Sequence, residues 1–243
     1  MPLMLRNLLL AFVVYSLLLA GFSTIFVPHV MDIAIHEICA ISIVAVVLAH
    51  VYLMRSFFKL VLQQRAPFFV YRNFTLLGIV ISLVAALLSG VCISYYLFQG
   101  LIEVDRHVAH LFHNAATSYL LLFIGLHLGC YASKFFAWLD NSIMSSTVRA
   151  NWLTKFPSTI IKLGLLVVAY HGALQVCRVD YFDKLTLQQS FSIVDYDSPM
   201  ASLIINNLAI LGFYFMLSAS VSYVLLVLST KKESKARTKN AIA

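Results

Sequence analysis

Charged residues and helix-breaking residues are both scarce in this 243-residue chain. Asp, Glu, Lys and Arg together make up 11% of it, and there are five prolines and nine glycines. A water-soluble domain needs far more polar surface, so the composition excludes one of any size. The hydrophobic content of 61% and the mean hydropathy of +0.90 instead predict an integral membrane protein.

Several sequence motifs are missing as well. The four cysteines form no C-x-x-C pair, so neither covalent c-type haem nor an iron–sulfur cluster is indicated. We expect them to be buried, small apolar residues: Cys39, Cys92, Cys130 and Cys177. There is also no glycine-rich phosphate loop and no dinucleotide fingerprint. Any nicotinamide or flavin chemistry must therefore come from another protein.

Six hydrophobic runs reach the roughly 20 residues that a helix needs to cross a bilayer. We interpret the first as a span rather than a signal peptide, because a single charge, Arg6, precedes it and no small-residue cleavage site follows. The fold class expected is an all-α integral membrane protein with six transmembrane helices, at Leu8–Val27, Ala34–Met54, Phe74–Phe98, Val108–Tyr131, Pro157–Val176 and Ser202–Leu228.

Positive charge is distributed unequally between the two ends of these spans. With a cytoplasmic N-terminus, 14 of the 17 Lys and Arg residues fall inside, and only Arg106, Arg178 and Lys184 fall outside. This agrees with the positive-inside rule, and six spans return the C-terminus to the cytoplasm. We expect a multi-pass protein of the bacterial inner membrane, whose basic segment Lys231–Lys239 meets anionic lipid headgroups. The net charge of +7 then requires no nucleic-acid partner.

Two pairs of histidines share one spacing inside these runs. His36 and His50 are 14 residues apart, and so are His113 and His127. In a helix, the second imidazole of each pair returns to within roughly 40° of the first, about 21 Å further along the axis. One span separates the two helices, so they run parallel. His36 is therefore expected to face His113 near the outer ends, and His50 to face His127 near the inner ends.

Facing imidazoles on parallel helices suit the axial ligation of haem iron. Ionisable residues within a bilayer usually serve a function, because they are costly there. We therefore predict two non-covalent b-type haems in a bundle of the first four spans, one haem per facing pair of histidines. The expected function is single-electron transfer across the membrane, as a component of a membrane oxidoreductase. A quinone pool and a redox partner protein are the expected partners.

Other roles for the same histidines remain open. In a haem-free scaffold, assembly subunit or transporter, they would form hydrogen bonds between helices. A transporter more often has helices broken near the midplane, and no proline lies deep within any expected span. A quinone-linked oxidoreductase acting at the outer haem, such as a superoxide oxidase, is a further alternative. The sequence does not separate that activity from simple electron relay.

Four stretches resemble a family of small bacterial membrane proteins of unassigned function, which is grouped with the dihaem cytochrome b subunits of formate dehydrogenase and nickel–iron hydrogenase. They are HEICAISIVAVVLAHVYL from His36, YRNFTLLGIVISLVAALLSG from Tyr71, HNAATSYLLLFIGLHLGCY from His113 and FSIVDYDSP from Phe191. The resemblance implies that the four histidines are axial ligands. Ala40 departs from the glycine expected four residues after the first ligand.

The remaining expectations concern the ends of the spans. Arg55 at the inner side and Arg106 at the outer side are candidate partners for haem propionates. His107 and His110 are expected at the outer surface, either simply solvated or passing protons to a quinone. A metal patch with His29 is an alternative for these two. Residues 1–135 are expected to form the haem-binding bundle, and residues 136–243 to add two helices, an outer loop and the basic tail.

Overall fold

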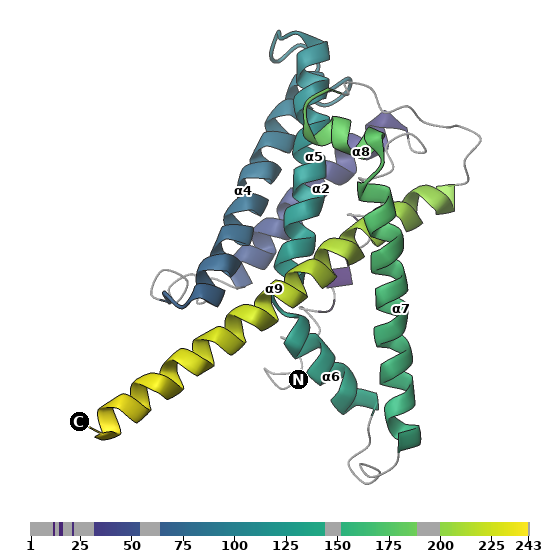
Figure 1. Cartoon of the computed structure of the whole chain (residues 1–243). Coiled ribbons are helices and arrows are strands. Elements are labelled where there is room, and N and C mark those ends of the chain that lie inside the picture. The colour runs from purple at the N-terminus through teal and green to yellow at the C-terminus, as the bar shows by residue number, and fades with distance from the viewer. Residues whose placement is uncertain are drawn as a thin grey trace, which may run out of the picture.

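Helices make up all the regular structure in the described part of the chain. The computed structural model describes residues 12, 15–16, 21, 32–53, 64–143, 152–188 and 200–242. Five of its helices are long and apolar enough to cross a membrane, so the chain is an all-helical membrane protein. In chain order the helices are α2 (Ile33–Leu53), α4 (Pro67–Ile93), α5 (Arg106–Gly129), α6 (Ala132–Ile143), α7 (Trp152–Val176), α8 (Val179–Leu185) and α9 (Met200–Ile242) (Figure 1).

The expected spans and the observed helices agree in order but differ at their ends. The first expected span, Leu8–Val27, lies outside the described residues apart from isolated positions. Helix α4 begins at Pro67, where the missing N–H of proline is not needed. It ends at Ile93 rather than at Phe98, because the N–H groups of residues 95–97 donate to a carboxylate instead of continuing the helix. Helix α9 continues well past Leu228, to Ile242.

Helix α5 begins at a side-chain cap. The Oδ1 atom of Asp105 accepts hydrogen bonds from the backbone N–H groups of His107 at 2.8 Å and Val108 at 3.4 Å. These are two of the N–H groups that have no partner within the helix. The cap sets the start of α5 at Arg106 and so fixes the position of every later residue along and around this helix.

Small residues allow α4 and α5 to pack closely as antiparallel neighbours. The buried side of α4 repeats at intervals of three or four residues and carries Thr75, Gly78, Ser82, Ala86 and Ser89. A Cβ atom on Gly78 would overlap the ring of Phe123 on α5. In lipid, helices gain little from hydrophobic burial against each other, so such close contact is a main source of association. This stripe of small buried residues on α4 therefore fixes the register of α4 against α5.

Helix α9 packs against both α5 and α7. Gly125 and Gly129 lie against the α9 backbone, and a core cluster joins Leu121 of α5 to Ile210 and Tyr214 of α9. The predicted regions 1–135 and 136–243 are thus in direct contact.

Two short helices were not expected from the sequence. Helix α6 follows α5 after a turn and is tied to α7 by an ion pair between Asp140 and Lys162, at 3.0 Å. Helix α8 buries Tyr181 against α5. Both are too short to be found by a search for hydrophobic runs of about 20 residues. They pack against the bundle instead of crossing the membrane.

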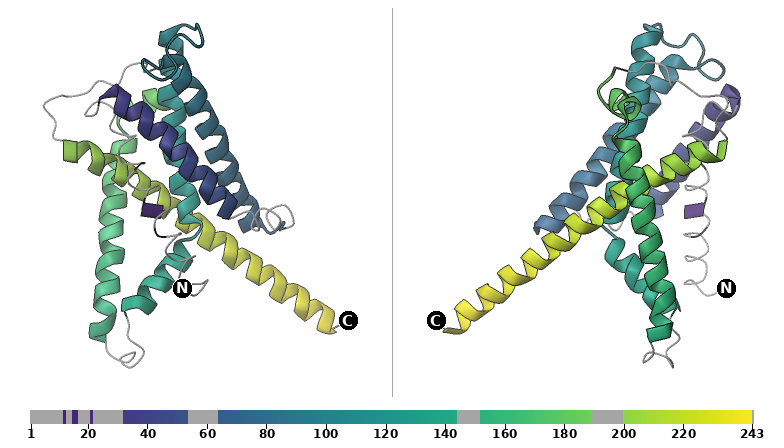
Figure 2. Two further views of the ribbon diagram at one scale, coloured as in Figure 1. Left: turned by 180° about the vertical axis from the view of Figure 1, so that it is seen from behind. Right: turned by 45° about the vertical axis from the view of Figure 1, so that its right-hand side comes forward.

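Helix α2 stands apart from this packing. None of its residues is buried, and it has none of the close backbone packing seen between α4 and α5, α5 and α9, or α7 and α9. It runs across the bundle and points in the same direction as α5 (Figures 1 and 2). The predicted parallel arrangement of these two helices therefore agrees with the structure.

The packing of α7 on α9 yields a test based on two glycines of one helix. A Cβ atom at Gly172 would overlap the backbone of Ala209, whereas no atom of the described residues lies within 4 Å of one at Gly164. We expect Gly172→Ala to destabilise the protein by about 1–3 kcal/mol, because the helices must separate. Gly164→Ala should be neutral or slightly stabilising, since alanine favours helix. Thermal unfolding in detergent compares them, and equal melting temperatures would contradict the packing.

Candidate functional site

His36 on α2 and His113 on α5 lie opposite each other at one end of the bundle. Their ring centroids are 6.5 Å apart and their planes are inclined by 82°. Both side chains are half-buried, and Nδ1 of His36 is buried without a hydrogen-bond partner among the described residues. The structure thus brings together the first pair that the 14-residue spacing predicts.

Helix α4 orients the ring of His113 from behind. Nδ1 of His113 lies 3.0 Å from the carbonyl oxygen of Ala86 and 3.2 Å from Oγ of Ser89. A carbonyl oxygen can only accept, so Nδ1 carries the hydrogen, and Nε2 of the neutral ring keeps its lone pair. That is the tautomer that a metal-binding imidazole needs.

The ring of His127, near the C-terminal end of α5, is held in a similar way. Its Nδ1 lies 3.1 Å from Oγ1 of Thr75, which itself donates to the carbonyl oxygen of Arg72 at 2.7 Å. The hydroxyl hydrogen is already used, so Thr75 accepts the hydrogen of Nδ1. The second histidine of α5 therefore also has Nε2 available as a lone-pair donor.

His50 lies at the same end as His127. The two imidazoles are within range of electrostatic interaction, and the ring of Tyr15 lies 5.6 Å from that of His50. The ring of Tyr131 lies 5.4 Å from that of His127, one turn further along the chain. The second predicted pair thus shares one level of the bundle.

Sequence reasoning missed the supporting residues Thr75 and Ser89. They are 14 residues apart on α4, the same spacing as His113 and His127 on α5. Because α4 and α5 are antiparallel, Ser89 meets the first histidine and Thr75 meets the second. The repeated spacing is the sequence signal for these two residues, but it identifies them only once the register of α4 against α5 is known.

The cationic residues near the two levels differ in burial. Arg72 is only 5% exposed, lies within electrostatic range of His127 and places its guanidinium 4.9 Å from the ring of Phe69. Arg106, predicted as the outer partner of a propionate, is exposed and lies over Tyr95 at 4.8 Å. Arg55, predicted for the inner level, lies outside the described residues. Arg72 is therefore a buried cation that the structure brings to the inner level.

A carboxylate lies beside the outer pair. Glu37 follows His36 on α2, and its two oxygens accept hydrogen bonds from Ser94 and from the backbone N–H groups of Tyr95, Tyr96 and Leu97. These donors belong to the loop that joins α4 to α5. Glu37 thus links α2 to the loop between α5, which carries the other two histidines, and α4, which supports them.

The other histidines occupy different settings. His107 is exposed and His110 is half-buried at the start of α5, while His29 lies outside the described residues. Nε2 of His171 on α7 pairs with Oδ1 of Asn206 on α9 at 3.0 Å, which is a hydrogen bond between helices. Within the described ranges, no three His, Cys, Asp or Glu side chains gather as a metal site. Bis-histidine ligation of haem needs only two.

The cysteines are all free, and the expectation that all are buried is wrong. Cys130 is buried and Cys39 and Cys92 are half-buried, whereas Cys177 is exposed. Cys177 lies in the turn after α7, beyond the packed part of that helix.

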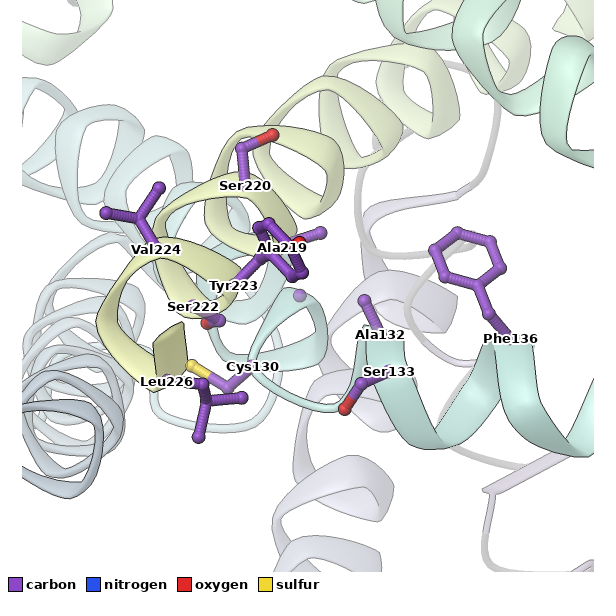
Figure 3. Close-up of a pocket in the computed structure, with 11 residues that line it drawn as sticks. Cys130, Ala132, Ser133, Phe136, Ala219, Ser220, Ser222, Tyr223, Val224 and Leu226 are labelled. Atoms are coloured by element: carbon purple, nitrogen blue, oxygen red, sulfur yellow. The ribbon is translucent and has the colours of Figure 1, made fainter. Parts of the chain in front are cut away.

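A pocket of about 400 Å³ lies beyond His127, where α6 turns away from α5 (Figure 3). Its lining is mainly apolar and includes Cys130, Phe136 and Tyr223, with hydroxyl groups from Ser133 and Ser222. None of its lining residues is acidic or basic. The pocket therefore offers space but little chemistry beside the inner level.

Comparisons with known proteins identify no relative of this chain. No family model matches it, no curated protein matches it, and no solved structure matches it. The resemblance to dihaem cytochromes b stays a prediction drawn from the residues.

Proposed function

We propose that this protein is a dihaem b-type cytochrome that carries electrons across the bacterial inner membrane. The observation that carries the proposal is the opposition of His36 and His113, with rings 6.5 Å apart on two helices that are long and apolar enough to cross a membrane. A chance packing contact between two rings would not also orient their nitrogens, and α4 orients those of His113 and His127 on α5.

The spacing of the outer pair fits a metal between the two rings. Metal–nitrogen bonds to imidazole are about 2.0–2.1 Å long, so two imidazoles on opposite sides of one metal have centroids about 6 Å apart. The observed 6.5 Å is close to that value. The buried, unpartnered Nδ1 of His36 marks a polar atom that the described residues leave unsatisfied. The two histidines would hold a haem here, and its iron would supply one-electron chemistry.

The residues of this chain have distinct parts in that proposal. His36 and His113 hold the outer haem, and His50 and His127 hold the inner one. Ser89 and Ala86 fix the tautomer of His113, and Thr75 fixes that of His127. Arg72 offers the inner haem a buried guanidinium, which suits a carboxylate such as a propionate. At the outer level, Arg106 remains the proposed partner of a haem propionate.

The two ligand levels suit transport across the bilayer. Fourteen residues of helix separate them by about 21 Å, against a hydrocarbon core of about 30 Å. Each level thus lies near one face of the membrane, within reach of a different partner. We propose a quinone as the lipid-soluble partner and a redox protein as the other, with both chain termini in the cytoplasm.

The visible spectrum of the purified protein, oxidised and then reduced with dithionite, tests this function. We expect two b-type haems per chain. His113→Ala and His50→Ala should each lose one haem, because each removes one axial ligand. His171→Ala is the matched control, since this histidine lies in a spanning helix but pairs with Asn206, and it should retain both. A colourless protein from haem-replete cells would reject the cytochrome and favour the scaffold.

The hydrogen bonds to Nδ1 predict a graded change in haem potential. Thr75→Val removes the acceptor described for His127, which makes that imidazole a weaker donor to ferric iron. We expect the inner midpoint potential to rise by up to about 60 mV, a tenfold change for one electron. Ser89→Ala should raise the outer potential less, because the carbonyl of Ala86 still accepts.

Ser82→Ala provides the control for this titration. Ser82 lies on the same stripe of α4, but its hydroxyl bonds to the carbonyls of Gly78 and Ile79. Both potentials should stay at their wild-type values in this variant. Equal shifts in all three variants would attribute the effect to helix packing rather than to the imidazoles.

Removal of the Arg72 charge should shift the inner midpoint potential in the opposite direction to Thr75→Val. A buried cation stabilises the reduced haem, which carries one positive charge fewer than the oxidised haem. We expect Arg72→Gln to lower the inner midpoint potential and to leave the outer one unchanged. Redox titration of both haems measures this, and an unchanged inner potential would show that Arg72 does not act on that haem.

A further inference from the structure

The position of α2 poses a physical problem that the other spanning helices do not share. Helices α5, α7 and α9 meet backbone to backbone at small residues, whereas no residue of α2 is buried and its Ile43 meets Gly21 only through a flexible side chain. Apolar side chains match the bilayer and set the depth of a helix, but lipid tails satisfy them at any rotation. The placement of His36 opposite His113 therefore requires some directional contact.

Glu37 supplies a contact of this kind. Its Oε1 accepts from the N–H of Tyr95 at 2.8 Å, and its Oε2 accepts from the N–H of Leu97 at 2.8 Å and from Oγ of Ser94 at 2.9 Å. The N–H of Tyr96 lies 3.4 Å and 3.3 Å from the two oxygens. Consecutive N–H groups that converge on one anion hold it in a defined orientation. Hydrogen bonds to a charged acceptor are also the stronger ones.

The donors of this contact belong to the segment that supports His113. Ser94 caps the C-terminal end of α4, one and a half turns beyond Ser89, whose hydroxyl lies 3.2 Å from Nδ1 of His113. Ser94 also accepts from the N–H of Phe98 at 3.0 Å, which shapes the loop around the carboxylate. The end of α4 therefore contacts both sides of the outer pair, His113 through Ser89 and α2 through Glu37.

We propose that Glu37 is a positioning residue, which fixes the rotation of α2 and thereby places the ring of His36 opposite that of His113. This inference deepens the proposed function, since on that proposal the same contact sets the ligand geometry of the outer haem. The position after His50 carries Val51, so the inner level lacks an equivalent carboxylate on α2. We therefore expect the effect of Glu37 to be largest at the outer level, where the contact lies.

One experiment tests the positioning without any haem. Paramagnetic labels at Ile41→Cys on α2 and Leu88→Cys on α4, both exposed positions, report the distance between the helices in the full chain. The four native cysteines are replaced by alanine in this background. We expect one narrow distance distribution with Glu37 and a broader or displaced one with Glu37→Gln, which loses one acceptor oxygen. Asp180→Asn also removes an exposed carboxylate and should leave the distribution unchanged.

A second measurement connects the contact to the outer haem. The electron paramagnetic resonance signal of a low-spin ferric haem depends on the angle between its two imidazole planes, and these planes are nearly perpendicular in the outer pair. Glu37→Gln should change the signal and the midpoint potential of the haem that His113→Ala removes. The other haem should change less, and the Asp180→Asn variant should keep wild-type values for both.

The outcomes separate the two proposals. Absence of haem from the wild-type protein would reject the cytochrome, while the label distances would still decide the role of Glu37. Unchanged distances in Glu37→Gln would overturn that role, whether or not haem is bound. Equal changes at both haems would also overturn it, because they would indicate a general loss of structure.

Discussion

The antiparallel contact between α4 and α5 is the constraint on which the rest of the structure depends. In lipid, the apolar faces of these helices match the hydrocarbon in any arrangement, so burial alone chooses neither neighbour nor register. The choice is made by the small residues of α4 and by the ring of Phe123, which occupies the space above Gly78. A shift by one turn would move Ser89 and Thr75 away from the two histidines together. Packing and polar satisfaction therefore select the same register.

That register also explains why the two histidine-bearing helices are held so differently. On α5, each imidazole already has one nitrogen paired with α4, which leaves the other nitrogen directed elsewhere. On α2, Nδ1 of His36 is buried with no such support in the described part of the chain. An imidazole in an apolar setting is stable only when its polar atoms are satisfied. The α5 histidines are thus preorganised by the bundle, while those of α2 depend on how α2 is attached.

Much of this arrangement could be predicted from the sequence. Hydropathy predicts the spans, and the number of spans between two helices predicts whether they run parallel or antiparallel. The 14-residue spacing predicts that His36 meets His113, and the ring contact agrees. The roles of Thr75 and Ser89 could not be predicted in the same way. Serine and threonine in membrane helices commonly bond to a carbonyl of their own helix, as Ser42, Ser82 and Ser220 do. Only the register of α4 against α5 distinguishes the two that also reach a histidine.

The ends of the helices were harder to predict for a related reason. Hydropathy extends the third span to Phe98, since residues 94–98 are mostly apolar, yet the helix stops at Ile93. The competing interaction is the carboxylate of Glu37, which lies 57 residues earlier in the chain and accepts from the same N–H groups. A local pattern contains no information about such a distant acceptor. The short helices α6 and α8 likewise owe their place to contacts with α7 and α5.

On the proposed function, the two levels are electrostatically unequal. A buried guanidinium, that of Arg72, lies near His127, and a carboxylate, that of Glu37, lies beside His36. In a medium of low dielectric constant, a cation favours the extra electron of a reduced haem and an anion opposes it. The N–H groups around Glu37 offset part of its charge, whereas the guanidinium of Arg72 is buried. The fixed charges therefore bias an electron towards the His50 and His127 level. The protein, rather than the haem itself, would then set the direction in which transfer is favourable.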